Sequence, residues 1–111
     1  MVHQVAISLN SKYILEAATR VFSDDSSISS KLILVDLKLN CLNMPNYQEI
    51  ASLKKFFDSQ NERFASSILC SIVGYYLTYN KCDRALRSKL CALCGISEKQ
   101  IFIENKKELP D

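Results

Sequence analysis

The sequence predicts an all-α protein, a bundle of five to six helices around one long apolar helix. The 111 residues include two glycines and two prolines, too few for the many tight turns of a β-sandwich or a barrel. The longest uncharged stretch, 64–80, is short for a membrane span and contains several hydroxyl side chains, so we expect a buried core helix there. Hydrophobic residues make up 48% of the chain, which is ordinary for a single folded domain over 1–111.

Two helices are expected before the first proline. The first is capped by a polar residue within 8–11 and runs to about residue 22, and the polar run 23–27 follows it. Residues 28–44 fit a helix or a strand, because their apolar residues recur at spacings of three and four and also alternate with polar ones. We favour a helix, since no partner strand is visible and a lone strand cannot satisfy its edges.

The middle of the chain predicts a capped helix and then the central one. Asn46 followed by Glu49 resembles a capping box and starts a helix to about residue 59. The helix expected over 61–79 is apolar nearly all round. Its small residues are expected on one side, where they would allow close helix packing: Ala65, Ser66, Ser67, Ser71 and Gly74. Its tyrosines are expected in the core with their hydroxyls at the rim: Tyr75, Tyr76 and Tyr79.

The last part of the chain has the pattern of a helix-turn-helix. Asp83 can cap a helix that runs to Cys94, and Gly95 stands where a helix-terminating glycine belongs. A Ser-x-x-Gln capping box at 97–100 then predicts a final helix to about residue 109. A helix, a short glycine turn and a second capped helix together form this motif.

Positive charge is concentrated on that motif. Residues 1–80 carry seven basic and seven acidic side chains, whereas 81–107 carry seven basic and three acidic ones. The basic residues are Lys81, Arg84, Arg87, Lys89, Lys99, Lys106 and Lys107. Such side chains suit phosphate oxygens, and they predict contacts to nucleic acid. The alternative is an ordinary solvated surface, since the net charge of the whole chain is +2.

The second half of the chain resembles the second half of a cyclin-like repeat of the transcription factor IIB type. The segments that carry the resemblance are ASSILCSIVGYYLTYN and DRALRSKLCALCGISEKQIFIENKKEL. The opening, VHQVAISLNSKYILEAATRVF, is similar to the first helices of one branch of that family, subunit six of the eukaryotic origin recognition complex. Residues 24–60 do not match the family pattern.

This resemblance implies a cyclin-like, non-enzymatic domain that binds double-stranded DNA during replication initiation in the nucleus. The last two helices would make the contacts, and other subunits of the origin recognition complex would be partners. The family carries basic residues before the turn glycine, which points first to Arg87 and Lys89. The resemblance implies no cofactor, no small-molecule substrate and no membrane association.

The cysteines do not form a recognisable metal or redox site. Cys91 and Cys94 are three residues apart, but zinc needs four ligands, and the chain has one histidine and no second such pair. A thioredoxin-type pair lies at a helix N-terminus, whereas this one lies at a helix C-terminus. No secretory signal is visible, so reduced thiols at core positions of an intracellular protein are expected.

Three other functions remain open. One is a protein-interaction adaptor of the same fold without DNA affinity, whose interface is the Phe56–Phe57 surface or the segment 24–60. Another is a homeodomain-like transcription factor, since LCALCGISEKQIFIENKK resembles its second and third helices, although tryptophan and the Asn-Arg-Arg of the recognition helix are missing. An enzyme ranks last, because His3 has no recognisable nucleophile partner.

Overall fold

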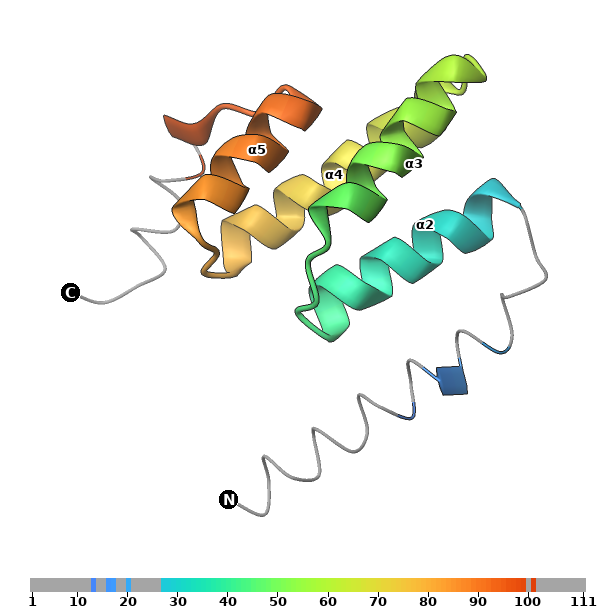
Figure 1. Ribbon diagram of the computed structural model, residues 1–111, viewed down its shortest axis with the longest axis horizontal. Coiled ribbons are helices and arrows are strands. Elements are labelled where there is room, and N and C mark those ends of the chain that lie inside the picture. The colour runs from blue at the N-terminus through green and yellow to red at the C-terminus, as the bar shows by residue number, and fades with distance from the viewer. Residues whose placement is uncertain (1–12, 14–15, 18–19, 21–26, 100, 102–111) are drawn as a thin grey trace.

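The computed structural model describes residues 13, 16–17, 20, 27–99 and 101. Helices joined by short turns make up this part of the chain, and no strand occurs in it (Figure 1). The elements from residue 27 onward are α2 (Ile28–Asp36), η1 (Leu37–Cys41), α3 (Tyr47–Ser59), α4 (Arg63–Tyr79) and α5 (Arg84–Cys94). The all-α prediction is confirmed for these residues. Most of the predicted first helix lies outside them, and five to six helices and the cyclin-like arrangement stay predictions.

The ambiguous segment 28–44 is helical, as predicted. Ser27 caps α2 by accepting a hydrogen bond from the Ser30 amide at 3.2 Å. The buried side chains follow the helical spacing, since Leu32 and Val35 are buried while Ile33 of the strand-like pattern is 49% exposed. The helix widens at η1 into a π-helical turn. The left-handed Asn43 (φ 51°) follows it.

Helix α3 begins at the predicted cap. The Asn46 side chain accepts a hydrogen bond from the Glu49 amide at 3.2 Å, which satisfies one free N–H of the first turn. Only this half of the capping box forms, because the Glu49 carboxylate instead pairs with Lys38 Nζ at 2.9 Å. That ion pair links the start of α3 to η1.

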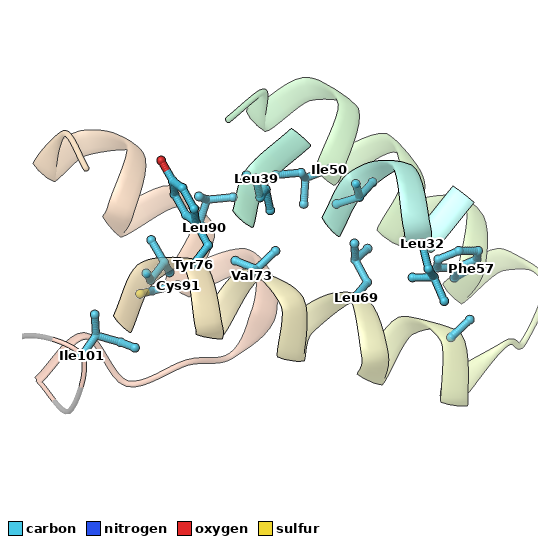
Figure 2. Close-up of a cluster of buried hydrophobic side chains, with 13 residues drawn as sticks. Leu32, Leu39, Ile50, Phe57, Leu69, Val73, Tyr76, Leu90, Cys91 and Ile101 are labelled. Carbon is cyan, nitrogen blue, oxygen red and sulfur yellow. The ribbon is translucent and has the colours of Figure 1, made fainter. Parts of the chain in front are cut away.

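Helix α4 is the central helix, since it packs against α2, η1, α3 and α5. Figure 2 shows Leu69, Val73 and Tyr76 pointing from α4 toward the other helices. The Tyr76 hydroxyl donates a hydrogen bond to Asn43 Oδ1 at 2.7 Å, so its buried polar end is satisfied. This tyrosine is in the core, as predicted.

Two predictions about α4 were wrong. Tyr75 and Tyr79 are exposed by 59% and 57%, because α2, α3 and α5 together cover only part of the helix surface. The small residues do not share one side: Ala65 and Ser66 are buried, whereas Ser67 and Ser71 are exposed. An exposed stripe therefore runs along α4, formed by Phe64, Ser67, Ser71, Tyr75 and Tyr79. We call it the outer face of α4.

Helix α5 has both predicted ends. The Asp83 carboxylate accepts hydrogen bonds from the Ala85 and Leu86 amides at 3.1 and 3.2 Å. Gly95 ends the helix in the left-handed conformation (φ 66°), which a residue without Cβ adopts at little cost. After this turn Glu98, Lys99 and Ile101 are helical. The remainder of the predicted last helix lies outside the described residues.

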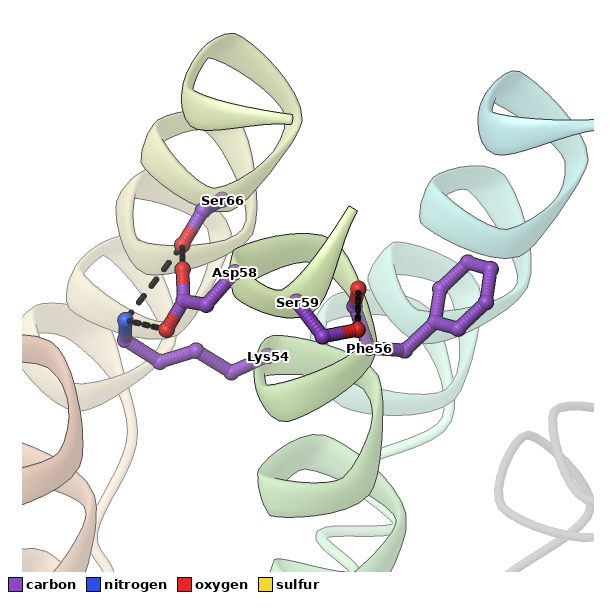
Figure 3. Close-up of polar contacts among 5 residues, drawn as sticks. All are labelled: Lys54, Phe56, Asp58, Ser59 and Ser66. Carbon is purple, nitrogen blue, oxygen red and sulfur yellow. Dashed lines mark hydrogen bonds and ion pairs between the residues drawn. The ribbon is translucent and has the colours of Figure 1, made fainter. Parts of the chain in front are cut away.

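A polar network ties α3 to α4 (Figure 3). Lys54 Nζ donates to Asp58 Oδ2 at 2.8 Å, and the Ser66 hydroxyl donates to Asp58 Oδ1 at 2.8 Å. Hydrogen bonds from Lys54 and then from Ser66 lower the pKa of Asp58, and the bond to Asp58 raises the pKa of Lys54. Ser66 is buried, so the network also satisfies a hydroxyl inside the helix interface.

This network makes a testable contribution to acid stability. Because the pKa of Asp58 is lower in the folded chain, its contribution is present above the ordinary carboxyl value of 3.8 and is lost as the pH falls through the folded value. We expect Asp58→Asn to destabilise the chain near neutral pH and to match wild type in strong acid. Urea denaturation of both proteins across the acid range measures the difference. If the difference in unfolding free energy between the two proteins does not change with pH, the ionised Asp58 does not contribute to stability through this network.

Candidate nucleic-acid interface

Three of the predicted basic side chains line one hollow beside α5. Arg84 and Arg87 are three residues apart on the helix and so lie on one face. The Gly95 turn brings the chain back, and Lys99 joins them. Cys82 and Glu98 complete the lining of this hollow, whose volume is about 570 Å³. We call it the basic hollow.

Arg87 is the most constrained of the three cations. Its side chain is partly buried, and its Nε atom is fully buried without a hydrogen-bond partner among the described residues. An unpaired buried donor costs about 1–3 kcal/mol. Arg87 also lines the hollow, and a guanidinium donates strong hydrogen bonds to phosphate oxygens.

The electrostatic balance of the hollow favours an anion. Its lining carries three positive side chains and one negative one, Glu98. The Glu98 carboxylate already accepts a hydrogen bond from the Ser88 hydroxyl at 2.8 Å, which occupies part of its acceptor capacity. Arg84 and Lys99 are exposed, so a ligand as large as a nucleic-acid backbone has access to them.

The remaining predicted basic residues do not line this hollow. Lys81 is exposed and adjoins Cys82 in sequence, just before α5. Lys89 lies elsewhere, because two residues along a helix turn a side chain by about 200° away from Arg87. Its ammonium group lies 5.6 Å from the Tyr47 ring centroid at the start of α3. Arg87 and Lys89 therefore do not form one contact surface. Lys106 and Lys107 lie outside the described residues.

The thiols near the hollow are protonated at neutral pH. Burial raises the pKa of Cys82 and of Cys91, although the Arg87 guanidinium opposes both shifts. Burial, followed by a hydrogen bond with the Cys70 thiol, raises the pKa of Cys94 to about 12. A thiol that stays protonated is a poor nucleophile and a poor metal ligand. Within the described residues, no three His, Cys, Asp or Glu side chains gather where they could hold a metal ion.

The predicted Phe56–Phe57 surface is only partly exposed. Phe57 is 0% exposed and belongs to the core, whereas its neighbour Phe56 is 44% exposed. The predicted Phe56–Phe57 interface therefore reduces to Phe56, which lies beside a hollow of about 330 Å³ between α2 and α3. That hollow is lined by Lys31, Leu34, Val35, Glu49, Ser52, Leu53 and Phe56. The seven-residue spacing from Ile50 to Phe57 is the sequence signal that places Phe57 inside.

Comparison with known proteins gives no relative: no protein-family model, curated protein or solved structure matches the chain. The described helices include none that is long and apolar enough to cross a membrane.

Proposed function

We propose that this chain is a non-enzymatic domain that binds the phosphate backbone of double-stranded DNA, with the basic hollow as its contact surface. The resemblance to subunit six of the origin recognition complex extends this proposal to replication initiation in the nucleus. Backbone contacts of this kind position a protein on a duplex and carry little sequence information. Weak sequence preference is therefore part of the proposal.

One observation carries the proposal: the fold brings three cationic side chains to one hollow. Arg84, Arg87 and Lys99 come from both sides of the Gly95 turn, so their convergence is a property of the folded chain. An ordinary solvated surface disperses its cations, whereas these three line a single hollow with one carboxylate, Glu98.

Salt dependence tests the proposal directly. Each neutralised phosphate contributes a slope of about −0.9 to a plot of log K against log salt, so three contacts predict a slope of about −2.7. We expect the affinity for a short fluorescent duplex to fall about 40-fold between 50 and 200 mM salt. Fluorescence anisotropy measures it. Salt-independent binding, or no binding at low salt, would contradict the proposal.

A protein-interaction adaptor is the second candidate, and the exposed Phe56 beside its hollow favours it. Lys31 Nζ lies 5.7 Å from the Phe56 ring centroid, so the ring is held at the rim between α2 and α3. If the chain is an adaptor without DNA affinity, a protein partner that wild type retains in a pull-down is lost with Phe56→Asp. The circular dichroism spectrum of the variant should be unchanged, which shows that it still folds. Phe57→Asp is unsuitable for this test, because it places a charge in the core.

A further inference from the structure

Three segments of the chain meet along one side of α4. Ser66, Cys70 and Gly74 are spaced four residues apart, so they lie on one face of this helix. Lys54 of α3 contacts the first of them, since its Nζ atom donates to the Ser66 hydroxyl at 3.3 Å. The chain after α5 contacts the last, because a methyl group on Gly74 would lie 3.5 Å from Ile96 Cδ1. Cys70 therefore lies between α3 and the C-terminal end of α5.

Two thiols come together at this junction. The Cys70 thiol and the Cys94 thiol share a hydrogen bond, although the two cysteines belong to different helices. Both cysteines are partly exposed, so a small molecule has access to them, whereas Cys91 is 2% exposed. The sequence pattern pairs Cys94 with Cys91, but the thiol that contacts Cys94 from another helix is that of Cys70.

We propose that Cys70 and Cys94 form a redox-active dithiol, which a low-molecular-weight disulfide such as glutathione disulfide oxidises to an intramolecular disulfide. One protein thiolate attacks a sulfur atom of glutathione disulfide, which forms a mixed disulfide and releases the first glutathione. The second cysteine then attacks the protein sulfur of that mixed disulfide, forms the Cys70–Cys94 bond and releases the second glutathione. Two electrons pass from the protein to glutathione disulfide, and the two thiol protons end on the two glutathione molecules.

The fold favours this second step over a lasting mixed disulfide. The second thiol is already in hydrogen-bond contact with the first, so its attack is intramolecular and needs little movement. Cys94 is also the last residue of α5. A helix end adjusts more easily than a helix interior when two sulfur atoms approach to about 2 Å. The bond would fix the end of α5, where the chain turns at Gly95, to the central helix.

The surroundings of Cys94 set the rate of this oxidation. Burial, followed by the hydrogen bond with Cys70, raises the pKa of Cys94, although the Lys54 ammonium opposes the shift. Because the thiolate is the attacking form, oxidation is slow at neutral pH and its rate is expected to rise about tenfold between pH 7 and pH 8. A rate that does not change with pH would contradict thiol–disulfide exchange at this pair.

Peptide mapping of the oxidised full chain tests the proposal, and it does not depend on DNA binding. The reduced chain is incubated with glutathione disulfide, its remaining thiols are alkylated, and its tryptic peptides are analysed by mass spectrometry. We expect the peptide 64–81, which contains Cys70, to be linked to the peptide 90–99, with fragmentation placing the bond at Cys94. A chain that stays reduced, or that carries only glutathione adducts, would overturn the proposal.

Two alanine substitutions on α5 provide a matched comparison. Cys94→Ala is expected to abolish the link between α4 and α5, because it removes one of the two sulfur atoms. Cys91→Ala, about one turn earlier on the same helix, should form the same disulfide as wild type. Circular dichroism checks that both variants are folded, and the wild-type peptide map decides alone where one is not. A disulfide between Cys70 and Cys91, or equal loss of the link in two folded variants, would overturn the assignment.

Discussion

Replacing Phe57 with alanine is expected to lower the free energy of unfolding by about 3–5 kcal/mol, as truncation of a buried phenylalanine does elsewhere. Phe57 is 0% exposed, and it belongs to the same core as Leu69 and Val73 of α4. Removal of its ring deletes buried apolar contacts and leaves a cavity at the interface of the helices. A domain of this size has a total stability of about 5–15 kcal/mol, so the variant loses a large fraction of it.

The neighbouring residue provides the matched control. Phe56 has the same side chain on the same helix but is 44% exposed, so Phe56→Ala should cost less than about 1 kcal/mol. Chemical denaturation of both variants, followed by circular dichroism, measures the two values. Equal costs would show that Phe57 is not in the core and that α3 is rotated from its present orientation.

This pair shows what the sequence determines and what it leaves open. The run of lysines and phenylalanines in α3 predicts an amphipathic helix, but composition does not say which phenylalanine faces inward. The spacing from Ile50 to Phe57 does say so, because seven residues are about two helical turns. For 28–44 the spacing left helix and strand open, and the helix was predicted because no partner strand is visible; the exposure of Ile33 agrees with the helix.

Helix ends were predictable because their determinants are local. The caps at Asn46 and Asp83 and the left-handed Gly95 depend on residues within a few positions of each other. The exposure of Tyr75 and Tyr79 depends instead on where α2, α3 and α5 lie around α4. Since α4 is apolar on nearly every side, its own sequence does not distinguish the covered face from the outer face.

The sequence alone identified which part of the chain is basic, but it did not show which of the basic side chains lie together. Seven basic residues identify the last part of the chain, but Arg87 and Lys89 point in different directions on α5. Lys99 is fifteen positions after Arg84, and it reaches the same hollow because the chain reverses at Gly95. This grouping depends on how the chain turns at Gly95, so it could be seen only in the three-dimensional structure.

The basic hollow predicts which charges matter for DNA affinity. Arg84→Glu combined with Lys99→Glu is expected to weaken duplex binding about 100-fold at low salt, and to reduce the magnitude of the salt slope by about 2. Both side chains are exposed, so the fold should tolerate the change. Arg87 is left in place, because its partly buried side chain would make loss of folding and loss of binding difficult to separate.

A control with the same change in net charge separates the hollow from a general charge effect. Lys55→Glu combined with Lys89→Glu also reverses two exposed cations, on α3 and on the side of α5 that faces Tyr47. We expect this variant to lose less than about fivefold in affinity and to keep the salt slope, because long-range attraction is screened within about 10 Å at 0.1 M salt. Fluorescence anisotropy across a salt series compares the two variants. Equal losses would mean that affinity follows net charge, and that the convergence of Arg84, Arg87 and Lys99 has no part in binding.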